Sequence, residues 1–275
     1  MESRILAIAA IMVSALCLRP GPVIARISQA GLASGQGSQG PGGRGRGGRG
    51  AGPAAQAKPA GPVPRTADGK PDMNGIFSGD GGGGRGEPIS FQPWAAEKNK
   101  LFVSRQMADN PTARCLSPGI VRLTTVSFFP IQFVQLPKQM VILYEWDHFF
   151  RVIPLDSRRQ KSLDEVDTLQ SLGHSVGKWE GDTLVVDVIG LSDYTWIGDQ
   201  GGVHSDQLHI VERFTMLDAD TIEWKAMLED AKAWTKPWNT SAILKRRPPD
   251  DALMEYNCAE NNKQDDFPTA DKLVR

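Results

Sequence analysis

Short apolar segments separated by turn-forming residues dominate the chain from residue 131 to residue 258. The connections between them are rich in Pro, Gly and Asp, which is typical of strands joined by tight turns. We therefore expect a mostly β fold, an antiparallel calycin-like barrel, with a β-sandwich as the alternative. The predicted strands are 131–136, 139–146, 148–155, 183–190, 208–215, 221–228, 239–246 and 252–258.

One peripheral helix is predicted ahead of these strands. Pro93 suits the first turn of a helix, and residues 95–107 follow without a helix breaker until Asn110-Pro111. Long helices do not alternate with the strands, which argues against a parallel α/β fold.

The first 30 residues have the pattern of a secretory signal peptide. Arg4 precedes a 14-residue apolar run, 5–18, which is short for a membrane span, and Ser28 and Ala30 offer a cleavage site. An uncleaved anchor is one alternative. A lipoprotein at Cys17 is another, although Leu16 does not suit a lipobox. We expect a periplasmic or secreted protein with no stable membrane span after cleavage.

Residues 31–67 are rich in Gly, Pro and Ala and include the Arg-containing segment 44–49. Such a segment buries too little apolar surface to offset its ordering entropy, so we expect a disordered tether. The single folded domain is then predicted over 68–275.

Charge is distributed unevenly along the chain. Residues 1–67 hold eight Arg and Lys and one acidic residue, whereas 68–275 hold 23 basic and 31 acidic residues, a net charge of −8. Nucleic-acid binding requires clustered positive charge, so we expect no nucleic-acid partner for the folded part.

Two cysteines remain once a signal peptide is removed, Cys115 and Cys258. An even number of cysteines in an exported chain favours a disulfide, because that compartment is oxidising. Two unrelated buried thiols are the alternative. Neither cysteine lies in a recognisable nucleophile motif.

Two acidic residues interrupt apolar strand faces. Glu212 shares a face with Ile210 and Phe214, and Asp187 shares one with Val185 and Ile189. An isolated buried charge costs several kcal/mol, so each acid must face a polar cavity or pair with a cation. Arg151 and Arg213 are the expected partners.

The four histidines lie within residues 148–209. Imidazole and carboxylate ligate Zn, Fe or Mn, and we predict one divalent metal bound by His204 and His209, with His174 or Glu212 completing the site. The spacing matches no established zinc motif. Hydrogen-bonded structural histidines at the barrel rims are the alternative.

Acid–base chemistry without a metal is a further hypothesis, with His174, Asp187, His209 and Glu212 as the catalytic groups. A glycosidase-like variant pairs Asp182 or Asp187 with Glu212. Substrate contacts are predicted from Trp179, Arg151 and Trp196.

A serine hydrolase is disfavoured. Residues 173–177 match the nucleophile-elbow pattern G-x-S-x-G around Ser175. That elbow requires a strand–turn–helix context, and no helix is predicted after it.

Residues 173–196, with the sequence GHSVGKWEGDTLVVDVIGLSDYTW, resemble a family of exported bacterial proteins that share a GHSxGxWEGDTLVVD-type motif. Leu191 and Ser192 depart from the family's Gly-Phe-Asn-Asp pattern. The resemblance covers roughly 70–262 and implies export and a single domain, without an activity. The other matching segments are 93–100, 109–119, 204–214, 231–238 and 256–262.

Three functional classes follow. The first is an exported enzyme, a hydrolase or lyase, acting on a small organic or glycosidic substrate through a His/carboxylate site in the barrel. The second is a non-catalytic barrel binding a small ligand. The third is an envelope interaction module. Histidines converging on one cavity would favour the enzyme. An apolar cavity lined by Phe214, Ile222 and Trp224, with the histidines outside it, would favour the ligand-binding barrel. A filled interior would favour the interaction module.

Overall fold

The computed structural model describes residues 61–80, 86–105, 109–126, 128–198 and 201–260. The predicted signal peptide at 1–30 and the tether up to residue 60 lie outside these ranges. Within the described ranges, we find no helix with the length and apolar character of a membrane span.

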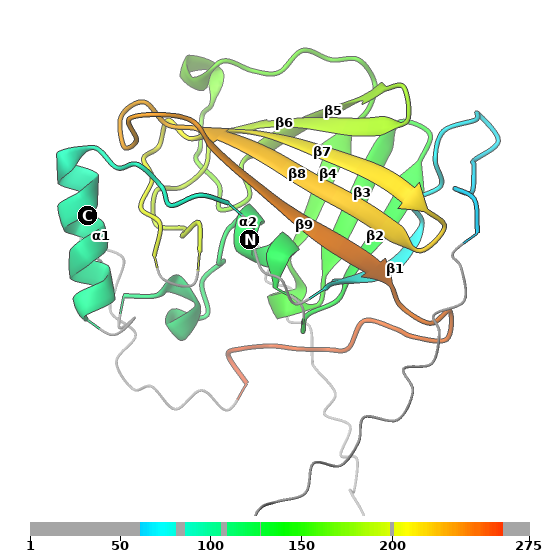
Figure 1. Cartoon of the computed structure of the whole chain (residues 1–275), viewed down its shortest axis with the longest axis horizontal. Coiled ribbons are helices and arrows are strands. Elements are labelled where there is room, and N and C mark those ends of the chain that lie inside the picture. The colour runs from blue at the N-terminus through cyan, green and yellow to red at the C-terminus, as the bar shows by residue number, and fades with distance from the viewer. Residues whose placement is uncertain (1–60, 81–85, 106–108, 127, 199–200, 261–275) are drawn as a thin grey trace, which may run out of the picture. The chain divides into compact units, whose positions relative to one another are not determined.

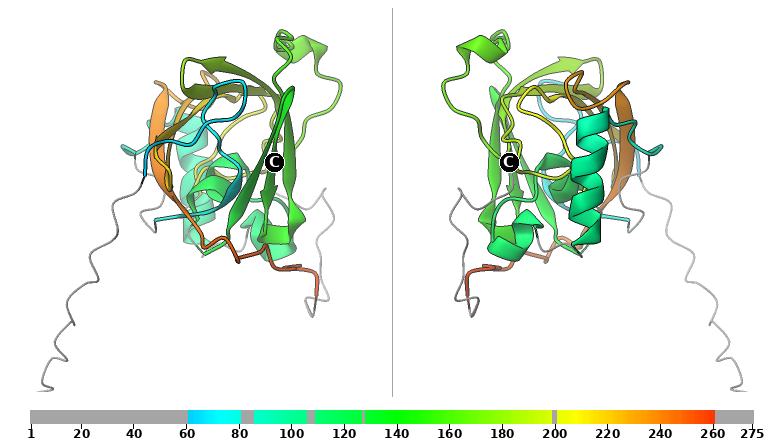
Figure 2. Two further views of the ribbon diagram at one scale, coloured as in Figure 1. Left: turned by 90° about the vertical axis from the view of Figure 1, so that its right-hand side faces the viewer. Right: turned by 90° about the vertical axis from the view of Figure 1, so that its left-hand side faces the viewer.

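The described strands form one antiparallel sheet that curls into a nearly closed barrel, which confirms the predicted fold class (Figure 1). Their order is β4-β3-β2-β1-β9-β8-β7-β6-β5. Figure 2 shows the curled sheet from its two sides. The strands are β1 (Gly75–Gly79), β2 (Ile131–Leu136), β3 (Gln139–Tyr144), β4 (Phe150–Pro154), β5 (His174–Glu180), β6 (Thr183–Ile189), β7 (His209–Asp218), β8 (Thr221–Glu229) and β9 (Trp238–Arg246).

Alternating side chains build the barrel core. On β8, Trp224 and every second neighbour point inward, and Trp224 pairs across the sheet with Phe214 of β7. Phe133 packs edge-on against both Phe77 and Phe214, with ring centroids 5.7 Å apart in each case. Large aromatic side chains therefore occupy the interior in which the sequence suggested an apolar ligand cavity.

Two α-helices accompany the sheet. The predicted peripheral helix is α1 (Pro93–Ser104), which begins at Pro93 as expected and stacks Phe102 on Trp196. The second, α2 (Ile120–Thr125), was not predicted; all six of its residues are buried. Short 3₁₀ helices occupy Pro111–Arg114, Trp146–His148 and Leu163–Glu165.

Three details differ from the sequence-based prediction. Strands β1 and β5 were missed, and the predicted strand at 252–258 is not a strand. The end of the predicted tether packs on the barrel: Val63 contacts the core, and Arg65 forms an ion pair of 2.6 Å with Asp182 in the β5–β6 turn. Ordered structure therefore begins by residue 61, ahead of the predicted boundary at 68.

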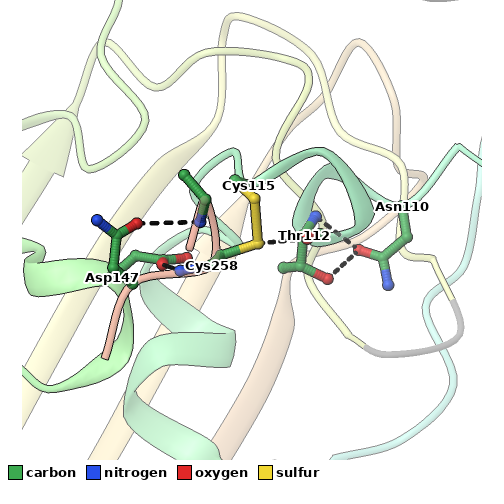
Figure 3. Close-up of a disulfide and its surroundings, with 7 residues drawn as sticks. Asn110, Thr112, Cys115, Asp147 and Cys258 are labelled. Carbon is green, nitrogen blue, oxygen red and sulfur yellow. Dashed lines mark hydrogen bonds between the residues drawn. A yellow bond between two sulfur atoms is a disulfide. The ribbon is translucent and has the colours of Figure 1, made fainter. Parts of the chain in front are cut away.

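The predicted disulfide between Cys115 and Cys258 is formed, with the Cα atoms 5.4 Å apart (Figure 3). It joins the C-terminal segment to the end of the 3₁₀ helix Pro111–Arg114, and hydrogen bonds hold that segment against the turn between β3 and β4. There the Cys258 N–H donates to Asp147 Oδ1, and Met254 N–H donates to Glu145 Oε2. Asp147 and His148 both have left-handed backbone angles, with φ of 51° and 55°. The C-terminal segment thus connects the end of the 3₁₀ helix Pro111–Arg114 with the turn that leads into β4.

Candidate functional site

Arg151 and Glu212 form a buried ion pair inside the barrel. Arg151 on β4 and Glu212 on β7 are 3% and 0% exposed, and both guanidinium Nη atoms donate to the carboxylate, at 3.2 and 2.5 Å. This is the pairing expected from the sequence for Glu212. Each charge of this buried pair is compensated by its partner, so the removal of either side chain alone would leave an unpaired charge in the barrel.

Three polar side chains complete this inner cluster. Trp224 Nε1 donates to Glu212 Oε1 at 3.0 Å, and Arg151 Nη2 donates to Ser175 Oγ at 3.0 Å. Burial raises the pKa of the neighbouring Tyr144 phenol, which therefore stays protonated. Arg151 Nε is buried without a hydrogen-bond partner among the described residues.

Asp187 and His209 form a second pair, on the outer face of the barrel. Asp187 Oδ1 lies 3.2 Å from His209 Nε2, and Glu229 Oε2 lies 3.8 Å from Nδ1. The hydrogen bond with Asp187 raises the pKa of His209, and the same bond lowers the pKa of Asp187. Arg213, the other cation expected to pair with one of the two strand acids, instead pairs with Glu180 at 2.8 Å.

The remaining predicted catalytic and metal-binding histidines lie apart from this pair. His204 is 1% exposed, and its ring nitrogens contact Thr195 Oγ1 and the Ser205 carbonyl, both at 2.8 Å. Burial lowers the pKa of His204, which favours the neutral ring. His174 on β5 contacts the Thr168 carbonyl at 2.9 Å through Nε2. His204 thus serves as a hydrogen-bonded structural group, whereas His174 is partly exposed and also lines a pocket beside β5.

The predicted metal site is not assembled. No group of three or more His, Cys, Asp or Glu side chains in the described part of the chain is arranged to hold a metal ion. His204 cannot contribute a ligand without losing a core hydrogen bond, because both of its ring nitrogens are engaged.

The residues predicted to contact a substrate do not lie together either. Trp196 is buried against Phe102, so it cannot stack on a ligand. Trp179 is half-buried on β5, with Lys70 Nζ 5.9 Å from its ring centroid. Ser175 of the G-x-S-x-G pattern lies within β5, which confirms that the segment lacks the strand–turn–helix geometry of a nucleophile elbow.

A site that the sequence did not predict lies at the seam between β4 and β5, the two ends of the strand order. The hydrogen bond between Arg151 and Ser175 crosses the seam, and the two sides also approach each other closely at Gly177. A Cβ on Gly177 would lie 2.6 Å from Leu155 Cδ2, so glycine permits the two strands to approach.

Two pockets form a continuous groove along this seam. The larger has a volume of 410 Å³, the smaller 270 Å³, and they share the four residues Val152, Gln170, Gly173 and Ser175. Residues 148–152, 170–173 and 175 line the larger pocket, whereas 158–161 and 173–176 contribute to the smaller. The missed assignment of β5 explains why the sequence did not reveal this groove.

Comparison of the sequence with models of known protein families and with curated proteins finds no match in either set. The function is therefore argued from the geometry of the seam and of the two acidic pairs.

Proposed function

We propose that this protein is an exported small-molecule-binding protein whose ligand occupies the groove along the β4–β5 seam. The observation that carries the proposal is the groove itself, because its larger pocket, at 410 Å³, falls within the range of about 300–1,000 Å³ typical of ligand sites. Aromatic and apolar side chains lie beside a few polar groups there, which is the usual composition of such sites.

Export is supported by two features. The N-terminal 30 residues have the pattern of a signal peptide, and Cys115 is cross-linked to Cys258. Disulfides persist in the periplasm and outside the cell, whereas the cytosol keeps thiols reduced.

Binding is favoured over catalysis because His174 alone among the candidate catalytic residues lines a described pocket, and the other candidates do not converge on it. Glu212 is buried and neutralised by Arg151, His204 is in the core, and the Asp187–His209 pair does not line either described pocket. The filled interior excludes a ligand at the centre of the barrel and by itself would favour an interaction module; the seam groove is what supports a small-molecule ligand instead.

The test uses the full chain with its disulfide intact and the neutral fluorophore N-phenylnaphthylamine. Val152 is 46% exposed and lines both pockets, so a V152W substitution should fill the groove and weaken probe binding by about ten-fold or more. The matched control is M227W, at a position 38% exposed on β8 outside both pockets. No saturable binding to the wild type, or an equal loss in both variants, would contradict the proposal.

A second candidate is acid–base catalysis on the outer face, favoured by the hydrogen bond that orients the His209 imidazole toward Asp187. Hydrolysis of nitrophenyl esters and glycosides, measured for the wild type and H209A, tests it. Turnover that is lost in H209A would support this candidate, and equal rates in both proteins would eliminate it.

A further inference from the structure

The groove along the seam has two chemically different ends. The larger pocket carries the apolar side chains of Phe149, Phe150, Val152 and Leu172. Phe150 is 63% exposed, which leaves an aromatic ring at the surface of an edge strand. The smaller pocket carries three cationic side chains, Arg158, Arg159 and Lys161.

The cations in this groove contrast with the rest of the folded chain. Residues 68–275 have a net charge of −8, yet none of the described residues that line either pocket is Asp or Glu. Positive charge gathered in a concave site attracts anionic ligands, because the low-dielectric walls focus the field.

Arg158 retains a donor for a ligand. Arg158 binds Asp156 through Nε and Nη2, so its Nη1 remains for another acceptor. Both arginine pairs are exposed: the side chains of Arg158 and Arg159 are 57% and 72% accessible. Exposed ion pairs are weak, so a ligand anion can share or replace the carboxylates of Asp156 and Glu165. Lys161 forms no ion pair with the residues that the structure describes.

From this polarity we infer that the ligand is an amphiphilic organic anion, with its apolar body over Phe150 and Val152 and its carboxylate or sulfonate group at Arg158, Arg159 and Lys161. This inference rests on the proposed binding function and names the class of ligand for the same groove. The shared residues Val152 and Gln170 connect the two ends, so one molecule spans both pockets.

The test compares two probes that differ by one acidic group: anilinonaphthalene sulfonate, which is anionic, and N-phenylnaphthylamine, which is neutral. We expect the wild type to bind the anionic probe with a Kd about ten-fold lower than that of the neutral probe. The triple variant R158Q/R159Q/K161Q should abolish this preference, so that the Kd values of the two probes become equal.

The matched control, R213Q/K225Q/K232Q, removes three exposed, ion-paired cations that lie outside both pockets. It alters net charge equally and should retain the preference. Equal affinity of the wild type for both probes, or an equal loss of preference in the two triple variants, would overturn the inference while the groove remains a binding site. Failure of the wild type to bind either probe would instead overturn the proposed function.

Discussion

Glu212 and Asp187 lie on adjacent, paired strands and end in opposite environments. Glu212 of β7 pairs with Val186 of β6, and Asp187 of β6 pairs with Val211 of β7, so the two acids are one register position apart. Because side chains alternate across a sheet, Glu212 points into the core and Asp187 points outward. Glu212 is fully buried with Arg151, whereas the Asp187 side chain is 41% exposed beside His209.

The difference teaches that an acidic residue on an apolar strand does not by itself indicate a reactive site. The inner carboxylate is fixed by Arg151 and Trp224 and closed to solvent. The outer carboxylate titrates with its histidine but lies on a convex face outside the described pockets. The ligand groove is at the seam, where β4 and β5 meet without strand pairing.

The largest expected effect comes from removing one partner of the inner pair. E212Q leaves the Arg151 guanidinium buried without a counter-charge, which should lower the free energy of unfolding by about 3–5 kcal/mol. Chemical denaturation at neutral pH measures it. The outer control, D187N, should change the free energy of unfolding by less than about 1 kcal/mol. Similar losses in the two variants would remove the distinction between the faces.

The replacement of both inner partners sharpens the same contrast. In the double variant R151M/E212L no unpaired charge remains, so much of the stability lost in E212Q should return. If the double variant is as unstable as E212Q, the loss reflects packing at these positions rather than an uncompensated charge.

A smaller effect is expected from the disulfide, which lies away from the inner pair and joins the C-terminal segment to the end of the 3₁₀ helix Pro111–Arg114. Replacement of Cys115 and Cys258 by Ser should lower the free energy of unfolding by about 2–4 kcal/mol. Thiol titration of the wild type under denaturing conditions serves as the control. Two reactive thiols in the unreduced protein, or an unchanged unfolding curve in the variant, would contradict the cross-link.

The smallest effect is the pH dependence of the outer pair. The pKa of His209 is raised above 6.5, so its interaction with Asp187 stabilises the fold below pH 6.5 and is lost as pH rises through the raised pKa. The pKa of Asp187 is lowered below 3.8, so its contribution is present above that pH and is lost as pH falls through the lowered pKa. Both side chains are about one-third or more exposed, at 34% and 41%, which limits the contribution to less than about 1 kcal/mol.

NMR titration of the His209 ring tests this effect directly. In D187N the pKa of His209 should fall toward its ordinary value of 6.5. An unchanged His209 pKa in D187N would assign the shift to another group, with Glu229 as the nearest candidate at 3.8 Å.

Periodicity in the sequence predicted most of the sheet, because strands such as β8 alternate cleanly between buried and exposed residues. The sequence also indicated that Glu212 pairs with a cation, and it predicted the disulfide between Cys115 and Cys258. Strand β5 was missed because Ser175 and Gly177 interrupt its apolar pattern, although Gly177 is what allows β4 to approach.

The site was less predictable than the fold. Periodicity assigns residues to a common face but does not say which face is inside, and on β6 the outward Val185 and Ile189 are buried as well. The spacing of the histidines likewise did not indicate that His204 is buried, with its ring nitrogens in contact with Thr195 and Ser205. The groove forms where the two edge strands of the curled sheet, β4 and β5, meet. How the sheet closes into a barrel cannot be read from the pattern of residues within any one strand.

The central claim is that the ligand site lies at the β4–β5 seam rather than inside the barrel or at the Asp187–His209 pair. Hydrogen–deuterium exchange of the full chain, with and without saturating N-phenylnaphthylamine, locates the site directly. We predict slower exchange in peptides covering 148–161 and 170–177, with no change in peptides covering 204–229. Protection confined to 204–229 would contradict the account.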